Sequence, residues 1–241
     1  MAQIRFEDIT LAFGNNTIVE NFNFNVVEGE IVTFFGPSGC GKSSIMKLIL
    51  GINTPSVGSI KIGDMEAMLY KMPISYVPQD NELLPWLSVK SNIELWSKNS
   101  ANSNLTSKEA LEMVDMLAHS DKLPAVLSGG MARRTALARG LATKSEILCF
   151  DEAMVGIEKT MRYKLLYNLR NYIKKNNVTA IFISHDYEET IFLSDKILLF
   201  TPPPTTVSKT IDVVALSNNA ERNGDFMGSP AFKEIYNQML G

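Results

Sequence analysis

The stretch Gly36-Pro37-Ser38-Gly39-Cys40-Gly41-Lys42-Ser43 decides the fold of this 241-residue chain. It matches the pattern G-x-x-x-x-G-K-[S/T], it follows the apolar segment 31–35, and a helical pattern begins at Lys42. Glycines at this spacing let backbone N–H groups wrap a phosphate, and the positive end of the following helix dipole favours the anion. The alternative is a glycine-rich strand–helix turn with an incidental lysine, but the flanking strand and helix make nucleotide binding the better explanation. The sequence therefore predicts an α/β protein with a nucleotide-phosphate site.

Within this loop the residue types indicate separate roles. The Lys42 ammonium is expected to reach the β- and γ-phosphates of a bound nucleotide, and the Ser43 hydroxyl is an expected ligand of Mg²⁺. A nucleotide and Mg²⁺ are thus the predicted cofactors. We expect the nucleotide to be contacted by Gly36, Ser38, Gly39, Cys40, Gly41, Lys42, Ser43 and Ser44.

A pair of acids follows a second apolar segment. Residues 147–150 are Ile-Leu-Cys-Phe, and Asp151 and Glu152 come directly after them. Parallel α/β sheets bind ligands at the carboxyl ends of their strands, and successive strand residues point to opposite sides. We expect Asp151 to hold Mg²⁺ through its water shell and Glu152 to orient and polarise the attacking water. Alone, such a pair is more often a solvated strand end, but beside the phosphate loop catalysis is the better explanation.

Hydrophobic periodicity divides the rest of the chain into elements. We predict strands over the ranges 4–10, 18–26, 31–35, 147–150, 179–184 and 197–200. We predict helices over 42–50, 108–118, 160–175, 186–193 and 231–240, and another after 128–130. The later strands alternate with helices, which indicates a parallel sheet with right-handed crossovers. A polar surface loop is expected over 101–107, and the prolines at 202–204 are expected to end the regular core.

Composition excludes several classes of protein. Lys and Arg total 23 against 26 Asp and Glu, so the formal charge of -3 gives no basic excess for binding nucleic acid. The two cysteines are far apart, and no Cys/His cluster has zinc-ligand spacing, which fits a reducing cytosol. The apolar runs are strand-sized and fall short of the roughly 18 residues that span a bilayer. Residues 1–7 alternate like a strand and do not resemble a signal peptide.

Three further segments point to one family. The segment Leu127-Ser128-Gly129-Gly130-Met131 and the helical run 132–139 after it resemble the signature motif of ABC ATPases. Gln79 follows one strand and His185 ends another, in the order that this family uses. A lone Ser-Gly-Gly is often only a helix N-cap, and a lone glutamine or histidine is usually structural. As an ordered set over nearly the whole chain, these motifs identify it as resembling the ATP-binding subunit of an ABC transporter.

The resemblance implies a fold, an activity and a location. The expected fold is that of a P-loop NTPase, with a RecA-like α/β core, N-terminal antiparallel strands and an inserted helical subdomain. One domain would span residues 1–241, with the helical subdomain at about 81–134 and a C-terminal extension over 202–241. The expected activity is hydrolysis of ATP to ADP and phosphate, coupled to transport. The expected location is cytoplasmic, peripheral on the inner face of the cell membrane.

The resemblance also assigns roles at the site. Ser128, Gly129 and Gly130 would complete the ATP pocket of a second subunit, so that two chains, expected to be identical, sandwich two ATP molecules head to tail. Gln79 would contact Mg²⁺ and the attacking water, and His185 would hydrogen-bond the γ-phosphate. Phe13 matches the aromatic residue that stacks on adenine, although an ordinary core phenylalanine explains it equally well.

One segment departs from the family pattern. After the catalytic pair the family normally resembles Pro-Phe-Ser-Ala-Leu-Asp, whereas residues Ala153–Glu158 read Ala-Met-Val-Gly-Ile-Glu. The loop joins the two ATP sites of the dimer, so slow or asymmetric hydrolysis is one expectation. A weakly hydrolysing regulatory ATPase is therefore an open alternative.

The segment after Gln79 indicates the type of transporter. Residues 80–89 are similar to the nitrate/sulfonate/taurine class of importer ATPases, in which this stretch adjoins the permease. The region Gln79–Leu87 is therefore the expected permease contact, and Leu83-Leu84-Pro85-Trp86 is either an exposed apolar patch or a locally buried loop. Residues 131–134 and 155–156 instead resemble the ATPase of lipid-trafficking systems. Import of a small anionic solute is favoured, with an external solute-binding protein as a candidate partner and no nucleic acid.

Overall fold

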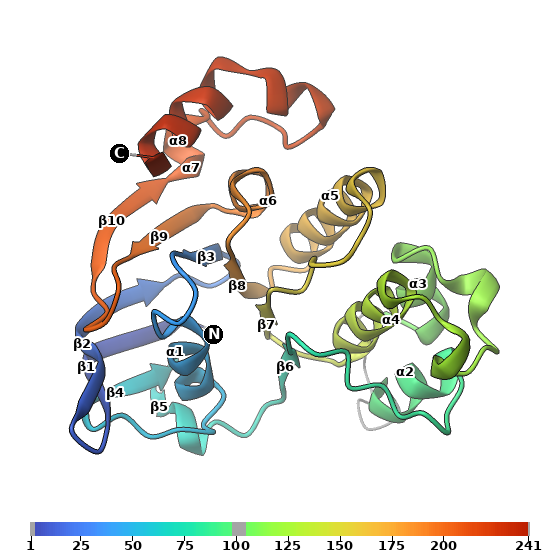
Figure 1. Ribbon diagram of the computed structural model, residues 1–241, viewed down its shortest axis with the longest axis horizontal. Helices are drawn as coiled ribbons and strands as arrows, with labels where there is room; N and C mark the ends of the chain where they lie inside the picture. Colours follow the sequence, from blue (N-terminus) through green and yellow to red (C-terminus); the bar gives the residue numbers. More distant parts are fainter. Residues whose placement is uncertain (1–2, 98–104, 241) are drawn as a thin grey trace.

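The computed structural model describes residues 3–97 and 105–240, and its elements form layers around one central sheet (Figure 1). This sheet contains β3 (Ile31–Phe35), β6 (Ile74–Val77), β7 (Ile147–Asp151), β8 (Thr179–Ser184), β9 (Lys196–Phe200) and β10 (Val207–Asp212). The strand order is β10-β9-β3-β8-β7-β6, with β9 and β10 antiparallel and the other neighbours parallel. The predicted α/β core is confirmed.

The inner strands are buried on both faces because their residues alternate between two apolar clusters. In β3, Val32 and Phe34 pack into one cluster, and Ile31 and Phe35 pack into the other. Strands β7 and β8 alternate in the same way. Apolar residues at both odd and even positions of a strand are typical of parallel strands that are covered on both sides. The carboxyl ends of these strands therefore remain the accessible edge for a ligand.

One face of the central sheet is covered by α1 (Lys42–Ile49) and by a second sheet. The second sheet is antiparallel, with the order β2-β1-β4-β5, and it comprises β1 (Ile4–Phe13), β2 (Asn16–Val26), β4 (Val57–Ile62) and β5 (Met65–Glu66). The ring of Phe22 in β2 lies with its centroid 6.5 Å from that of Phe34 and 5.8 Å from that of Phe200. The N-terminal antiparallel strands agree with expectation, whereas β4 and β5 were not predicted.

Helices cover the opposite face. The principal ones are α5 (Lys159–Lys175), α6 (Tyr187–Leu193) and α8 (Pro230–Leu240). On α5, Leu165, Leu166, Leu169 and Ile173 recur at helical spacing and are buried in the cluster on this side of the sheet. Burying each such side chain stabilises the fold by roughly 1.5–3 kcal/mol before entropy is counted.

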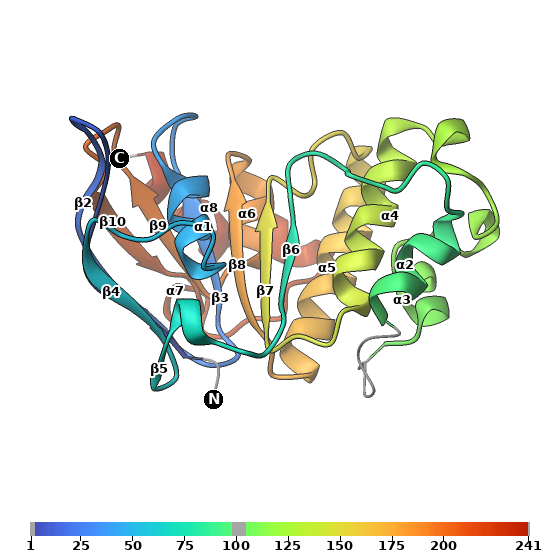
Figure 2. The ribbon, with the colours of Figure 1, turned by 90° about the horizontal axis from the view of Figure 1, so that it is seen from below.

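A group of helices lies beyond the β6 edge of the sheet (Figure 2). It contains α2 (Val89–Ser97), α3 (Ser107–Met113) and the start of α4 (Gly129–Ala142), with short 3₁₀ turns at Leu117–His119 and Pro124–Val126. This is the expected helical subdomain. Its last helix does not end near residue 134, however, because α4 continues to Ala142 against the core. Gly140 permits this approach, since a Cβ there would lie 2.5 Å from Val77 Cγ2.

Two predictions in this region are corrected or lie outside the described residues. The helix predicted over 108–118 ends at Met113 because the backbone turns at Asp115, where φ is +56°. The surface loop predicted over 101–107 falls largely on residues 98–104, which lie outside the described part of the chain. Its end at Thr106 is the N-cap of α3, where Thr106 and Glu109 form a capping box.

The C-terminal segment continues the core instead of leaving it. Residues 202–204 connect β9 to β10, and β10 adds an antiparallel strand to the central sheet. The expectation that the prolines end the regular core is therefore wrong. After β10 come α7 (Val213–Leu216), a 3₁₀ turn at Gly224–Gly228 and α8, which packs on the α6 side of the sheet (Figure 1). Within residues 3–97 and 105–240, no helix is both long and apolar enough to cross a bilayer.

Candidate functional site

The loop between β3 and α1 depends on glycines with left-handed backbone conformations. Gly39 has φ +77° and Gly41 has φ +99°, values that other residues rarely adopt. A Cβ added at Gly39 would meet no heavy atom within 4 Å, whereas one at Gly41 would lie 2.8 Å from Ile18 Cγ2 of β2. Gly39 therefore faces open space, and Gly41 allows the loop to pack closely against the neighbouring sheet.

Lys42 begins α1 and turns its side chain back beneath the loop. Its Nζ donates to the carbonyl oxygens of Gly36 and Pro37, both at 2.8 Å, and lies 3.6 Å from Cys40 Sγ. The residue is only 5% exposed. An ammonium group buried among neutral acceptors binds an incoming anion strongly, because little water has to be displaced from it.

A pocket of about 630 Å³ lies over this loop. Its volume falls in the range of small-molecule sites. It brings together most of the sequence-predicted residues, which line it together with Ile18, Pro37 and Ile183: Phe13, Gly36, Ser38, Gly39, Gly41, Lys42, Ser43, Ser44, Gln79, Glu152 and His185.

Phe13 and Cys40, both predicted to contact the nucleotide, differ in how exposed they are. Phe13 is 55% exposed at the rim of the pocket, so the alternative of a core phenylalanine does not hold. Its ring is free to stack on a planar group. Cys40 is 1% exposed and does not line the pocket; its carbonyl oxygen accepts a hydrogen bond from the Thr205 hydroxyl. The Cys40 side chain therefore packs beneath the loop.

Asp151 ends β7 with its carboxylate almost buried. The Tyr76 hydroxyl lies 3.5 Å from Asp151 Oδ2. Burial raises the pKa of Asp151, and hydrogen bonding from Ser43 and Tyr76 opposes that rise. Burial and the adjacent Asp151 charge raise the pKa of Tyr76 to about 12, so the phenol stays protonated. The two predicted Mg²⁺ ligands Ser43 and Asp151 are thus neighbours, and Gln79 faces the same pocket.

Glu152 is held by the other two predicted catalytic residues. Gln79 Nε2 donates to Glu152 Oε2 at 3.1 Å, and His185 Nδ1 lies 3.4 Å from Glu152 Oε1. The Glu152 backbone has φ +49°, and its N–H donates to the Ile183 carbonyl oxygen at 3.0 Å. A non-glycine residue in this conformation is strained, and such strain is concentrated at functional sites. The carboxylate is therefore aimed into the pocket by partners just after β8 and after β6.

Sequence reasoning did not single out Arg133, which joins the two sides of the pocket. It is 3% exposed and its guanidinium donates to the carbonyl oxygens of Pro78, at 2.7 Å, and Glu152, at 2.5 Å. Burial lowers its pKa from the ordinary arginine value. A signal existed in the sequence, because Arg133 lies at helical spacing from the apolar Ala136 and Leu137 and so falls on the buried face of α4.

The segment Ser128–Gly130 does not lie in this pocket. Ser128 caps α4, with its Oγ accepting from the Met131 N–H at 3.3 Å. A Cβ at Gly129 would meet nothing within 4 Å, and one at Gly130 would lie 3.2 Å from the Gly156 carbonyl oxygen. The helix start is therefore open and lies beside the loop that follows the catalytic carboxylates.

The atypical loop Ala153–Glu158 is anchored by its own apolar residues. Ala153, Met154 and Ile157 are buried, while Val155 is 49% exposed. Glu158 caps α5 by accepting from the N–H groups of Thr160 and Met161 at 2.9 Å and 3.1 Å. The departures from the family pattern thus produce an ordered loop that leads directly into α5.

The segment after Gln79 presents one large exposed ring. Trp86 is 71% exposed, whereas Leu83 and Leu84 are half-buried. Asn92 of α2 fixes the segment, because its side chain pairs with both the N–H and the carbonyl oxygen of Leu84, at 2.8 Å and 3.1 Å. The alternative of a locally buried loop therefore does not apply to Trp86.

Comparison with known proteins decides the family. A family model described as ABC transporter matches residues 19–155, more than half of the chain. The chain belongs to the ABC transporter family. It is an ABC-type ATPase, and its fold is that of an ATP-binding cassette.

Relatives with assigned roles include importer subunits. The chain is 32% identical over 201 residues to the aliphatic sulfonates import ATP-binding protein SsuB 2 of Burkholderia lata, an alignment that covers 83% of this chain and 74% of that protein. It is 30% identical over 232 residues to the Fe(3+) ions import ATP-binding protein FbpC of Photorhabdus laumondii, covering 93% of this chain and 66% of that protein. The chain thus spans about two thirds of the FbpC length.

Solved structures show the same fold at lower identity. A dimeric ATP-binding cassette bound to ADP and Pi, in a post-hydrolysis state, superposes with a TM-score of 0.77 at 22% identity and covers 87% of this chain and 98% of its own. A bacterial Atm1-family ABC exporter with ATP bound gives a TM-score of 0.77 over 100% of this chain and 42% of its own. Because importers and exporters share this cassette, the likeness bears on fold alone.

The residues of this ABC ATPase fit ATP with Mg²⁺. The pocket combines an open glycine loop, a buried ammonium and an exposed ring, which suit a phosphate chain and a planar base. Among the described residues there is no cluster of three or more His, Cys, Asp and Glu that could hold a metal by itself. Mg²⁺ needs none, since it is usually bound by one or two protein oxygens together with substrate phosphates. Ser43 and Asp151 supply such oxygens, and Gln79 adds an amide oxygen.

Proposed function

We propose that this chain is the ATP-hydrolysing motor subunit of a membrane importer, acting as a homodimer on a separate permease. The observation that carries the proposal is the convergence of Glu152, Gln79 and His185 on the pocket whose floor is the Lys42 loop. A hydrogen bond from Gln79 and the nearby His185 ring hold one carboxylate in the same pocket as a buried ammonium. This arrangement suits the attack of water on a terminal phosphate.

Each residue of the pocket then has a task in hydrolysis. Glu152 accepts a proton from the attacking water, and Gln79 and His185 hold it in place for that step. The Lys42 ammonium leaves its two carbonyl acceptors to bind phosphate oxygens, where it stabilises the charge that develops as the γ-phosphate departs. When bound at Ser43, Gln79 and Asp151, Mg²⁺ supplies additional positive charge to the phosphates.

The dimer is proposed from what a single chain lacks. The Ser128–Gly130 helix start has the free N–H groups and dipole of an anion site, yet it lies outside the ATP pocket of its own chain. A second copy related by a two-fold axis would place this segment over the first copy's pocket and close both sites at once. Hydrolysis would then require two chains, because each complete site would contain residues of both.

The permease contact is proposed at residues 79–87. Trp86 exposes most of its ring at the start of the helical subdomain, and large exposed aromatic rings are enriched at protein interfaces. The segment begins at Gln79, which bonds to Glu152, so movement of a permease at Trp86 would reach the catalytic carboxylate through a short stretch of chain. This contact would place the subunit on the cytoplasmic face of the membrane.

The solute proposed is a small anion of the nitrate, sulfonate or taurine kind. The support is the similarity of residues 80–89 to that class and the sulfonate-import role in the name of the Burkholderia relative. An external solute-binding protein would then deliver the solute. Lipid trafficking, which residues 131–134 and 155–156 resemble, predicts a different permease, so purification from solubilised membranes with the bound permease distinguishes the two roles.

The catalytic proposal is tested by phosphate release from the Glu152→Gln variant with the permease present. Removing the general base should lower the rate about a hundredfold or more while ATP still binds. Glu112→Gln, an exposed substitution on α3, is the matched control and should keep the wild-type rate. Phosphate release by Glu152→Gln at the wild-type rate would show that the base is elsewhere. A wild-type complex that binds ATP without turnover would favour the regulatory alternative that the loop Ala153–Glu158 raises.

A further inference from the structure

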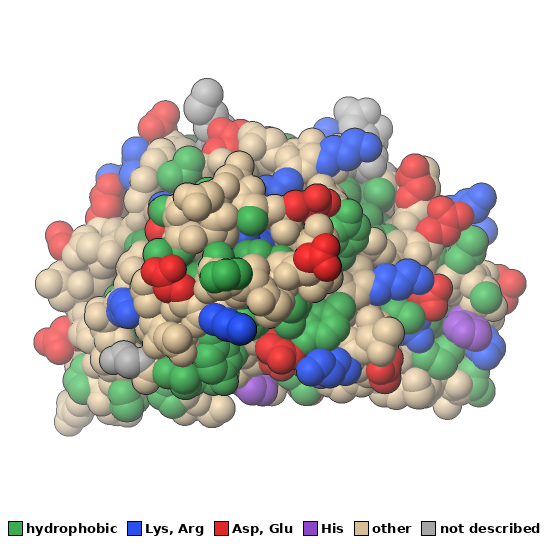
Figure 3. Space-filling view, turned by 90° about the horizontal axis from the view of Figure 1, so that it is seen from above, with side chains coloured by type: hydrophobic (Ala, Val, Ile, Leu, Met, Phe, Trp, Pro, Cys, Tyr) green, Lys and Arg blue, Asp and Glu red, His purple; other side chains and the backbone are tan. Residues whose placement is uncertain are grey.

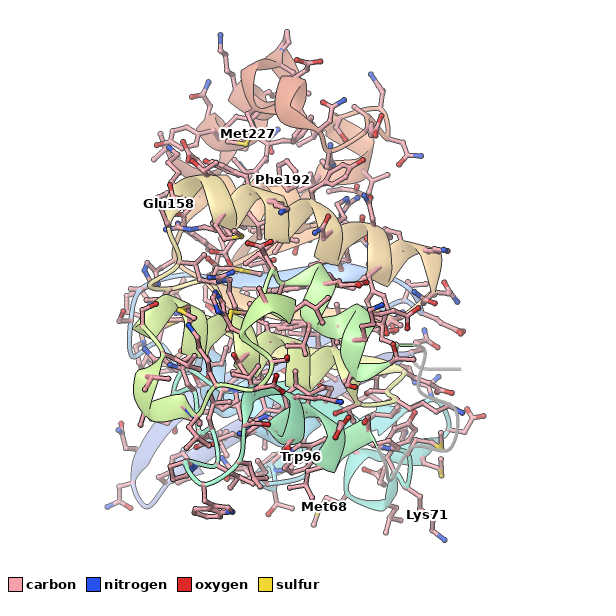
Figure 4. The ribbon with its side chains drawn as sticks, turned by 90° about the vertical axis from the view of Figure 1, so that its right-hand side faces the viewer. Met68, Lys71, Trp96, Glu158, Phe192 and Met227 are labelled. Atoms are coloured by element: carbon pink, nitrogen blue, oxygen red, sulfur yellow. The ribbon has the colours of Figure 1, made fainter. Side chains whose placement is uncertain are left out.

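A second pocket of about 630 Å³ lies away from the ATP site, between α5, α6 and the C-terminal segment. Figure 4 shows Phe192 of α6 between the ribbon of α5 and Met227 of the C-terminal segment. Its volume is in the range that holds a small organic molecule. Both helices begin near the ATP pocket, α5 after Glu158 and α6 after Asp186. The C-terminal segment thus turns one face of the two helices into a cavity.

The pocket is walled by aromatic and apolar groups. Tyr163 and Tyr167 are one turn apart on α5 and so face the same side. The ring centroids of Tyr163 and Phe192 are 6.4 Å apart with planes tilted by 55°. Met227 adds a polarisable thioether on the C-terminal side. Three aromatic rings line this one cavity, and aromatic rings attract cations over their faces.

The negative charge in the described part of this pocket comes from one carboxylate, that of Glu188. Glu188 of α6 accepts a hydrogen bond from the Tyr163 hydroxyl, and this bond together with Lys159 lowers the pKa of the Glu188 carboxyl. Lys159 Nζ lies 3.1 Å from Glu188 Oε2 and 5.8 Å from the centroid of the Tyr163 ring. The chain's own ammonium therefore already occupies the position that a bound cation would take.

An anionic ligand fits this pocket poorly. Among the described residues that line it, Lys159 is the only cation, and that ammonium is engaged by Glu188. Its side chain is 68% exposed, so the ion pair is weakly held and can open. Seen from the side of the C-terminal segment, basic and acidic side chains are interspersed, with no field of positive charge to attract an anion (Figure 3).

We propose that this pocket binds a small organic ammonium ion, with its alkyl groups against Tyr163, Phe192 and Met227 and its charge at Glu188. The ligand displaces the Lys159 ammonium, which swings into solvent. The site is separate from the ATP pocket, and the inference does not depend on which solute is transported.

The test uses the full chain with ¹³C-labelled methionine methyl groups. Choline chloride is the probe, sodium chloride keeps the ionic strength constant, and 3,3-dimethylbutan-1-ol is the uncharged molecule of the same shape. Choline should shift the Met227 methyl signal, which Met227→Leu assigns, and the alcohol should shift it much less. The Met68 methyl group, at the opposite end of the molecule in Figure 4, is the internal control and should not move.

Variants give opposite results for a cation and for an anion. Lys159→Ala removes the competing ammonium and should tighten choline binding about three- to tenfold, whereas Glu188→Gln should weaken it by a similar factor. Lys164→Ala on α5, which pairs with Asp115 instead, is the matched control and should leave the affinity unchanged. Loss of choline binding in Lys159→Ala would overturn the proposal. So would equal binding of the alcohol, or an unmoved Met227 signal at the highest soluble choline concentration.

Discussion

The loop Gly36–Ser43 and the helix start Ser128–Gly130 are both proposed to bind phosphate, yet their surroundings differ in how complete they are. Around the loop, Lys42, Glu152, Gln79 and His185 line one pocket, and hydrogen bonds or an ion pair link Glu152 to the last two. Around the helix start, Gly129 has open space where a side chain would be, and residues 128–130 are not among the described residues that line the ATP pocket. In the proposed dimer, the loop would bind the nucleotide within one chain, and the helix start would supply half of a second site.

This difference explains why the two segments should respond differently to mutation. Changes in the loop should affect binding within one chain, whereas changes at the helix start should affect only what two chains do together. Arg133 of α4, the helix that begins at Gly129, bonds to the Glu152 carbonyl oxygen, so it reports on how the helix start and the ATP pocket are connected.

The largest expected effect comes from Lys42→Ala. Without the ammonium, the phosphates lose their principal charged partner, and ATP hydrolysis should fall at least about a hundredfold together with ATP affinity. Isothermal titration with ATP and a phosphate-release assay measure the two effects. Lys47→Ala, an exposed lysine on the same helix, should change neither. Unchanged ATP affinity in Lys42→Ala would contradict the assignment of the pocket.

A smaller and more selective effect is expected from Gly129→Asp. Among the described residues no heavy atom lies within 4 Å of a Cβ at this position, and an acid in the first turn of a helix favours folding, so the monomer should remain stable and bind ATP normally. Repulsion of the partner's phosphate should nevertheless lower hydrolysis by about ten- to a hundredfold. Gly129→Ala adds only a methyl group and is the control. If Gly129→Asp hydrolyses ATP at the wild-type rate, this helix start takes no part in the site.

Arg133→Met tests the connection between the segments. It leaves the carbonyl oxygens of Pro78 and Glu152 without their donor, which should cost about 1–3 kcal/mol of stability and loosen Glu152. Arg134→Met is the matched control, because it breaks bonds to Val114 and Asp115 that lie outside the ATP pocket. Urea unfolding should show a lower free energy of unfolding in both variants. Only Arg133→Met should reduce the hydrolysis rate, and equal rates would mean that Arg133 serves folding alone.

The sequence alone was sufficient to locate the loop between β3 and α1 and the acidic residues opposite it. A glycine pattern between strand and helix fixes backbone geometry locally, so the loop and the acids at the end of β7 could be located from a few residues. The burial of strands on both faces was also visible, because apolar residues occupy both parities of β3, β7 and β8.

What could not be predicted depends on long-range contacts. β10 has only Val207 and Ile211 as apolar residues, and its pairing with β9 became visible only in three dimensions. The α3 helix ends at a single left-handed residue, Asp115, which periodicity does not reveal. Arg133 lies on an apolar helix face, but its carbonyl partners are 55 and 19 residues away in the sequence. Local sequence patterns locate the helices and strands. The partners of buried polar groups are set by contacts between residues far apart in the sequence.

The last expected effect, which depends on pH, concerns a cavity of about 230 Å³ beside Glu152, lined by Glu152, Gly156, His185 and Glu189, among others. Glu189 is 5% exposed, and burial raises the pKa of its carboxyl from 4.5 to about 8, with the nearby Asp186 charge adding to the rise and Arg162 opposing it. At neutral pH the folded chain therefore holds a proton here that the unfolded chain has released.

Because the folded state binds the extra proton, its stability should fall as pH rises from 4.5 to 8, by on the order of 1 kcal/mol per pH unit from this group. Above pH 8 both states are ionised and this dependence ends. Glu189→Gln, which cannot ionise, should be more stable than the wild type at pH 8 and equal to it near pH 4.5. Urea unfolding at several pH values measures the difference, with Glu112→Gln as the exposed control. A difference that stays constant across this range would show that Glu189 is ionised in the folded chain, and the Glu152 carboxylate would then have a second negative charge behind it.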